Sequence, residues 1–228
     1  GSLVFVTGSK FFSGPPFCSA LFVPKKFDVS ETWSNDFHTY FDPSSFPKVC
    51  RKKKSNNFST KPRIGHLVRW IFGIENMKSL YSIPKKIRDE FTVHFYEKSI
   101  DSINNLPNLS NLLDSETDHF PHEKSIVSFF IKKQNSPSFE NLKELRSIYY
   151  NFQNNNEKFH IPQPTKLLHE NSDSGVFRLS IGSDMIENLV DLSKKSSKDE
   201  AKRKLRLNIN QCLEELFAVT SLLQEYSK

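Results

Sequence analysis

The chain has 228 residues, of which 36% are hydrophobic and 13% aromatic, enough to form one large domain or two small ones. Its mean hydropathy is −0.53, no apolar run approaches the length of a membrane span and no signal-peptide pattern opens the chain. Three scattered cysteines, Cys18, Cys50 and Cys212, indicate reduced thiols rather than a disulfide framework. These features exclude an integral membrane protein and a small disulfide-rich scaffold, and they predict a cytoplasmic location.

The net charge of +6 raises the question of nucleic-acid binding. The basic residues gather in three runs, at 51–54, 194–195 and 202–204, in a chain that is rich in Asn, Lys, Ile and Phe throughout. None of these runs is interleaved with the aromatic residues on which bases stack. We therefore interpret the charge as a bias of composition and expect neither a nucleic-acid nor a membrane partner.

The first predicted elements are two apolar strands joined by a turn that contains a lysine. The run Leu3–Val6 is followed by three small residues and Lys10, and a turn at Gly14–Pro16 leads into a second run, Ala20–Val23. Lysine at the end of a buried strand is unusual, because lysine side chains normally stay solvated. Desolvation would favour the neutral amine of Lys10, which forms a Schiff base with an aldehyde.

This segment resembles the cofactor-lysine segment of fold type I pyridoxal-phosphate enzymes, most closely the class V aminotransferase and cysteine desulfurase group. That group has an apolar strand, Ser-x-His-Lys, and then Gly-Pro before another strand; here Thr7-Gly8-Ser9-Lys10 and Gly14-Pro15 take these places. The resemblance implies that Lys10 binds pyridoxal phosphate and that Thr7 and Ser9 lie near its phosphate group. Ser9 stands where the group often has His, which argues against desulfurase-type chemistry.

In these enzymes the phosphate loop, the aromatic residue that stacks on the ring and the carboxylate that pairs with the pyridine nitrogen all precede the lysine. Only nine residues precede Lys10, and the chain contains no initiator methionine. We therefore expect the chain to be the C-terminal portion of a longer enzyme and to be inactive by itself.

The segment after the turn predicts one irregular stretch and two helices. Residues 24–62 are rich in Pro, Ser, Lys and Asn, which is typical of a long loop. Apolar residues at helical spacing predict a helix from Ile64 to Leu80, and Pro84, a residue favoured at the first helical position, begins a second helix that extends to Ile103. Together they resemble the long helix that joins the two domains of fold type I enzymes.

The C-terminal part alternates predicted strands and helices. In chain order we expect a strand at 125–131, a helix at 139–150, a loop at 151–156, an extended segment at 159–164, a strand at 176–181, a helix from Ser183 or Asp184 and a closing helix at 205–223. The domain organisation predicted is the end of the large domain at 1–62, linking helices at 63–104 and the small domain at 105–228. The fold class is therefore α/β, the end of a fold type I large domain followed by an α+β small domain.

A second family-like motif is the Arg-x-Ser pattern at Arg178 and Ser180, in the last predicted strand. The resemblance implies that Arg178 forms a bidentate pair with a substrate carboxylate, for which a planar guanidinium is suited. The alternative is a strand arginine that reaches solvent or pairs with a structural acid.

Four other candidate residues receive structural interpretations. His119 and His122 lie in an acidic segment without a second pair of ligands, so we expect no metal site. His66 shares a predicted helix with Arg69 and is interpreted as a helix residue rather than a base. Cys18 is interpreted as a small buried strand residue.

The predicted function is pyridoxal-phosphate chemistry on an amino-acid-like substrate, transaminase-type, in an enzyme that is homodimeric in its full-length form. Lys10 would hold the cofactor and move protons at the substrate α-carbon. Decarboxylation and side-chain elimination remain open, since one fold hosts many reactions. The alternative is a non-catalytic, truncated or degenerate chain that keeps the fold without a cofactor pocket.

Overall fold

A computed structural model of the chain describes residues 4–8, 11–15, 18–22, 64–112, 124–133, 138–155, 159, 161–166 and 175–226. These residues combine helices with antiparallel strands and divide into two compact units, Gly1–Ser79 and Leu80–Lys228. Some predictions fall on residues outside the described part of the chain, namely those for Ser9, Lys10, Cys50, His119, His122 and the stretch 24–62.

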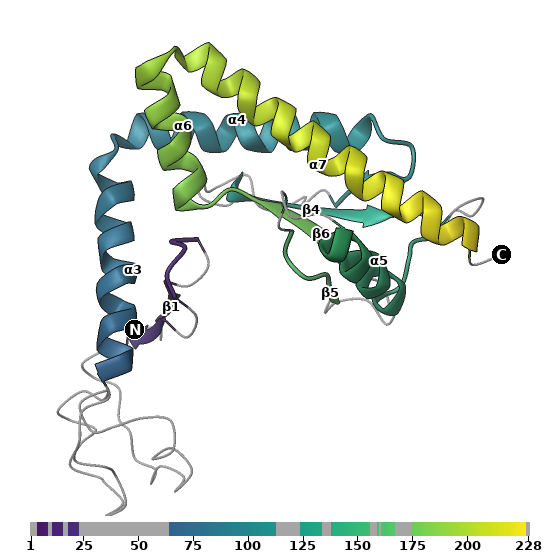
Figure 1. Ribbon diagram of the computed structural model, residues 1–228, viewed down its shortest axis with the longest axis horizontal. Coiled ribbons are helices and arrows are strands. Elements are labelled where there is room, and N and C mark those ends of the chain that lie inside the picture. The colour runs from purple at the N-terminus through teal and green to yellow at the C-terminus, as the bar shows by residue number, and fades with distance from the viewer. Residues whose placement is uncertain are drawn as a thin grey trace, which may run out of the picture. The chain divides into compact units, whose positions relative to one another are not determined.

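The first unit contains a β-hairpin and most of a helix (Figure 1). Strand β1 (Val4–Thr7) pairs antiparallel with β2 (Ser19–Phe22), as the two apolar runs predicted. Residues 8–18, between these strands, are called the lysine turn below. Helix α3 (Ile64–Ser82) confirms the helix predicted from Ile64 to Leu80.

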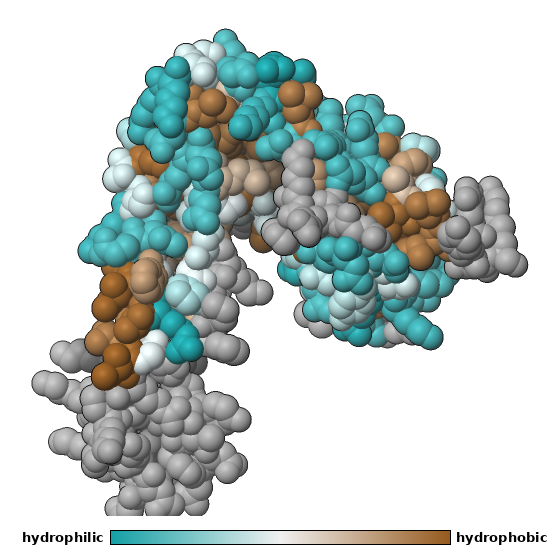
Figure 2. Space-filling model, in the orientation of Figure 1, coloured by the Kyte–Doolittle hydropathy of each residue, from teal (hydrophilic) through white to brown (hydrophobic). Residues whose placement is uncertain are grey.

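The apolar residues of α3 do not all face the interior. Ile64, Leu67 and Ile71 are between 50% and 67% exposed, and they contribute to the brown surface over α3 at the lower left of Figure 2. The helix instead presents Gly73 and Asn76 to the hairpin. Hydrophobic periodicity therefore predicted the helix correctly. It did not identify which face of α3 packs against the hairpin of the same unit.

Three helices of the second unit pack on one another. Helix α7 (Lys198–Tyr226) lies alongside both α4 (Lys85–Asn104) and α6 (Ser183–Lys195), as Figure 1 shows. Pro84 is the N-cap of α4, so this helix begins at Lys85, one residue later than predicted, whereas α6 begins at Ser183, one of the two predicted starts. Shifts of one residue at a helix end are common, because terminal turns are the least regular part of a helix.

The same unit contains a four-stranded antiparallel sheet. Its order is β3 (Leu109–Asn111), β4 (Ile126–Ile131), β6 (Gly175–Ser180) and β5 (Thr165–Lys166). Strands β4 and β6 confirm two predictions, whereas β3 and β5 were not predicted. Helix α4 contacts β3 and β4, and helix α5 (Leu142–Asn155) contacts β6.

The two faces of the sheet differ in burial. Phe129 of β4 lies opposite Phe177 of β6, their rings stack with centroids 6.0 Å apart, and both side chains are fully buried. On the other face Ser128 lies opposite Arg178, and both are half-buried. Because successive side chains of a strand point to opposite faces, Arg178 lies on the face opposite the stacked phenylalanines, a face that also carries the buried side chains of Phe130 and Val176.

Several predicted boundaries in this unit are wrong. Helix α5 begins at Leu142 rather than at residue 139. Helix α5 continues to Asn155, through most of the loop predicted at 151–156, because Phe152 follows Leu145 and Ile148 at helical spacing and is fully buried. Helix α7 begins at Lys198 rather than near Leu205, since Ala201 already packs in the core while the charged residues around it stay at the surface.

Candidate functional site

The residues on either side of Lys10 are tied together by backbone hydrogen bonds. The Gly8 N–H donates to the carbonyl oxygen of Cys18 at 2.7 Å, and the Gly14 N–H donates to the carbonyl oxygen of Gly8 at 2.8 Å. Gly8 and Gly14 are both buried. The described residues that flank Lys10 in the sequence are therefore linked by two backbone hydrogen bonds, both of which involve Gly8.

Gly14 occupies a place where a side chain does not fit. A Cβ atom added there would lie 2.6 Å from the carbonyl oxygen of Gly8, a backbone atom that cannot move aside. Ser13, the residue before it, has φ = 50°, in the left-handed region that costs a non-glycine residue about 1–2 kcal/mol. Such backbone persists only where the surroundings fix it.

Helix α3 supplies part of these surroundings. A Cβ atom at Gly73 would lie 2.8 Å from the sulfur of Cys18, so the glycine permits a close approach between the helix and the turn. Asn76, on the same face of α3 because it is three residues further on, donates from Nδ2 to the carbonyl oxygen of Phe12 at 2.8 Å. The helix therefore holds the turn through both packing and a hydrogen bond.

Cys18 fits its interpretation as a buried packing residue. It is 0% exposed, and its sulfur lies between the backbones of Gly8 and Gly73. Burial raises the pKa of the Cys18 thiol, and a hydrogen bond with the Gly8 backbone offsets this only in part. Cys212 in α7 is also free, and burial raises its pKa to about 12. Neither thiol is a ready nucleophile, because the thiolate is the reactive form.

Of the four predicted site residues, the structure describes Thr7 and Arg178. Thr7 is the last residue of β1, is half-buried, and donates from Oγ1 to the carbonyl oxygen of Cys18 at 3.5 Å, which is long for a hydrogen bond. Arg178 lies in β6 of the second unit. Thr7 is thus placed next to the lysine turn, and Arg178 belongs to a different unit.

The guanidinium of Arg178 is only partly engaged. Its Nη2 donates to the carbonyl oxygen of Gln163 at 3.4 Å, and its buried Nε has no hydrogen-bond partner among the described residues. Within the same residues no carboxylate forms an ion pair with it. The described surroundings therefore do not supply a structural acid for Arg178, and the alternative of a strand arginine that reaches solvent stays open.

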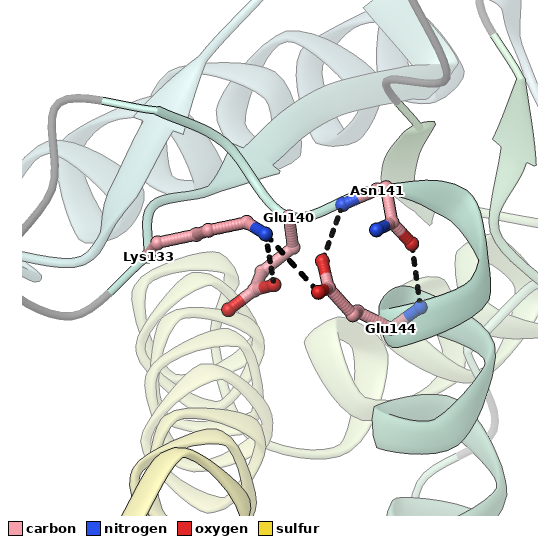
Figure 3. A network of polar contacts seen from close by, with 4 residues as sticks. All are labelled: Lys133, Glu140, Asn141 and Glu144. Carbon is pink, nitrogen blue, oxygen red and sulfur yellow. Dashed lines mark hydrogen bonds and ion pairs between the residues drawn. The ribbon is translucent and has the colours of Figure 1, made fainter. Parts of the chain in front are cut away.

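A polar network at the start of α5 was missed by the sequence analysis (Figure 3). The Asn141 N–H donates to Oε2 of Glu144 at 2.9 Å, and the Glu144 N–H donates to Oδ1 of Asn141 at 3.0 Å. This reciprocal pair is a capping box, and the signal that predicts it is Asn-x-x-Glu before an apolar helical run. Lys133 adds a contact of 3.1 Å from its Nζ to Oε1 of Glu144.

Glu140 makes this network unusual, because its carboxyl group is buried beside that of Glu144. The Oε2 of Glu140 lies 4.0 Å from Nζ of Lys133, and its side chain is 8% exposed. Burial opposes the ionisation of Glu144, but hydrogen bonds from Glu140, the Asn141 backbone and Lys133 together hold the pKa of Glu144 below its usual value. Each of these contacts supports the beginning of α5, so we assign the network to folding rather than to chemistry.

Comparisons with known proteins assign no family to the chain. No family model, curated protein or solved structure matches the chain. No helix in the part of the chain that the structure describes is both long and apolar enough to cross a membrane. Among the same residues, no three His, Cys, Asp or Glu side chains gather to hold a metal ion. The lysine turn and Arg178 are thus the candidates on which a function can be argued.

Proposed function

We propose that the chain is the C-terminal portion of a pyridoxal-phosphate-dependent enzyme that acts on an amino-acid-like substrate. The observation that carries this proposal is the lysine turn, closed by Gly8 and Gly14 and held by α3. A constrained turn after an apolar strand is the setting that a cofactor lysine needs, because the position of its amine has to be fixed. The hairpin is followed by helices α3 and α4 and by a unit of mixed helices and strands.

Of the residues described beside Lys10, Thr7 bears on the fit of the cofactor. Its hydroxyl donates to the Cys18 carbonyl oxygen over a long distance of 3.5 Å, and it would exchange this acceptor for a phosphate oxygen. When bound, pyridoxal phosphate acts as an electron sink for the α-carbon of the substrate. Lys10 would hold the group through its amine and transfer protons at that carbon, while Thr7 and Ser9 would bind the phosphate.

Arg178 would bind the substrate carboxylate. Its Nε lacks a partner among the described residues and its contact with Gln163 is long, so the guanidinium retains donors for a bidentate pair. The reaction we propose first is transamination, in a homodimeric and cytoplasmic full-length enzyme.

A titration with pyridoxal phosphate separates this proposal from the alternative of a degenerate chain without a cofactor pocket. We expect weak binding by the 228-residue chain, because a bond to Lys10 does not replace ring and phosphate contacts from other segments. Binding, followed by the change in cofactor absorbance, should be lost in Lys10→Ala and kept in Lys143→Ala, which alters an exposed lysine of α5. Equal binding by all three proteins would refute the role of Lys10.

A further inference from the structure

Helix α3 carries a continuous set of apolar side chains that are between 42% and 67% exposed and lie three or four residues apart, on one face of the helix. We call this set the α3 stripe, and it consists of Ile64, Leu67, Val68, Ile71, Phe72 and Ile74. Part of it is the brown surface over α3 in Figure 2. Monomeric proteins rarely leave so many neighbouring large apolar side chains in water, so the α3 stripe indicates a surface for a partner.

The α3 stripe lies opposite the face of α3 that packs within the first unit. Gly73 lies against the sulfur of Cys18, and Asn76 donates a hydrogen bond to the carbonyl oxygen of Phe12. At 3.6 residues per turn, Gly73 is rotated by about 180° from Ile64, and Asn76 by about 120°. The contacts that hold α3 in its own unit therefore leave the α3 stripe uncovered.

We propose that the α3 stripe is the interface with a second copy of this chain, in an antiparallel dimer whose two-fold axis passes near residue 69. The inference goes beyond the proposed function and does not rest on it, because it uses residues of α3 alone.

The spacing within the α3 stripe fits a second helix of the same sequence. Ile64, Leu67, Ile71 and Ile74 follow intervals of three, four and three residues, which are the intervals of the apolar positions in helices that pack side by side. In the antiparallel arrangement, Ile64 lies opposite the partner's Ile74, and Leu67 lies opposite the partner's Ile71. The same two pairs recur on the other side of the axis. The surface is therefore self-complementary, as a two-fold interface requires.

The area of the α3 stripe is sufficient for a dimer. An exposed apolar residue of this size presents about 200 Å², so six residues that are about half exposed offer on the order of 600 Å² per copy. Two copies would together bury about 1,200 Å², which is the lower end of the range for specific and stable interfaces. Burial of this apolar area favours association, and no charged residue belongs to the α3 stripe.

The charge at the end of the α3 stripe favours the antiparallel orientation. Lys78 is the next position of the same repeat after Ile74; its side chain is 66% exposed and pairs with Glu75 of its own helix at 2.6 Å. In a parallel dimer the two Lys78 side chains would meet at one level of the interface, where like charges repel each other. The antiparallel arrangement places them at opposite ends, outside the four apolar layers.

Sedimentation velocity of the 228-residue chain, at concentrations up to about 100 μM, measures self-association. We expect a dimer. Leu67→Glu and Ile71→Lys each introduce a charge into the interface, and each should weaken self-association by about tenfold or more. The matched control is Ile126→Lys, because Ile126 of β4 is 48% exposed and Ile71 is 50% exposed. This variant should dimerise like the unsubstituted chain, and circular dichroism checks that every variant is folded.

A mixture of the two charged variants tests the antiparallel register. In that register the glutamate of Leu67→Glu lies opposite the lysine of Ile71→Lys in the other copy. The mixture should therefore associate about tenfold more tightly than either variant does alone. In a parallel dimer residue 67 meets residue 67, so the mixture would gain no such pair.

A chain that stays monomeric at every concentration would overturn the inference, and the α3 stripe would then belong to a different protein or to another part of this chain. Self-association that the substitutions in the α3 stripe leave unchanged would overturn it as well. If one charged variant does not fold, the unsubstituted chain and the other variant decide between these results. A mixture that binds no more tightly than its components would contradict the antiparallel register. Failure of the proposed function has a different signature, since the attachment of pyridoxal phosphate to Lys10 is measured separately from association.

Discussion

Arg178 is a predicted site residue whose side-chain contacts the structure describes, so these contacts can be compared with the role proposed for it. It stands on the half-buried face of β6, opposite Ser128, away from the stacked phenylalanines of the core. The only protein acceptor that we find for it in the described residues is the Gln163 carbonyl oxygen, at 3.4 Å. Among the described residues its guanidinium therefore has one long hydrogen bond, and its buried Nε has none.

Arg178→Lys should therefore separate binding from stability. In the full-length enzyme that we propose, we expect weaker binding of amino acids by about one to two decades, because lysine cannot form the bidentate pair that contributes about 1.5–3 kcal/mol. Cofactor content and melting temperature should stay unchanged. Substrate saturation curves, cofactor absorbance and thermal unfolding measure these quantities. A large loss of stability would instead identify Arg178 as a structural residue.

The sequence predicted the environment of a single residue correctly where the residue type by itself favours that environment. The burial of Cys18 follows from a residue type that has a strong preference of its own. The contact between Asn76 and Phe12 was missed because it joins distant segments and because Asn76 lies outside the apolar pattern of its helix. Long-range polar contacts depend on how elements pack, and neither residue type nor spacing encodes that.

At the level of elements, the length of a strand determined whether the sequence predicted it. The six residues of β4 and of β6 carry enough apolar and β-branched residues to be recognised, whereas β3 has three residues and β5 two. Short strands form because a neighbouring strand offers hydrogen bonds, which is a tertiary effect. The extension of α5 to Asn155 has a similar origin, since burial of Phe152 outweighs the weak helix propensity of the asparagines around it.

Helices α4 and α7 are connected by a charged cluster centred on Glu90. Its two carboxylate oxygens lie 2.6 Å from Nζ of Lys202 and 2.9 Å from Nζ of Lys198. Hydrogen bonds from Lys202 and then Lys198 outweigh desolvation and lower the pKa of Glu90 from 4.5 to about 2. The folded protein therefore keeps Glu90 ionised at a pH at which the unfolded chain has already bound a proton.

The sign of the resulting pH dependence follows from this lowered pKa. The contribution of Glu90 to stability is fully present above about pH 4.5 and is lost as the pH falls toward 2. We expect Glu90→Gln to lower the free energy of unfolding by about 1 kcal/mol at neutral pH, and the difference from the unsubstituted chain to vanish in acid. Denaturant unfolding at a series of pH values measures both quantities.

Asp191→Asn is the matched control for this prediction. Asp191 pairs with Lys194 on α6 at 3.1 Å, but the two side chains are 63% and 70% exposed. An exposed pair of this kind contributes about 0.5 kcal/mol or less. A deficit in Glu90→Gln that is the same at all pH values would show that lost packing, and not charge, is responsible.

At the scale of the whole molecule, mixed helix and strand content was predicted and the division of the chain after Ser79 was not. That division lies within α3, whose first part joins the hairpin unit and whose last residues join the second unit. The first unit leaves large apolar side chains of α3 exposed (Figure 2), and a two-stranded hairpin is marginally stable by itself. Sequence patterns locate such elements, but the grouping of elements into units depends on which of their faces pack together.

The central claim, that Lys10 is the lysine that binds pyridoxal phosphate, is tested most directly by mapping where the cofactor attaches. The chain is incubated with a limiting amount of pyridoxal phosphate, reduced with borohydride and digested, and the labelled lysines are quantified by mass spectrometry. We predict that Lys10 carries most of the label, and that the remaining lysines are labelled at the lower level of exposed residues such as Lys143. Label spread evenly over the lysines, with Lys10 no higher than Lys143, would contradict the account.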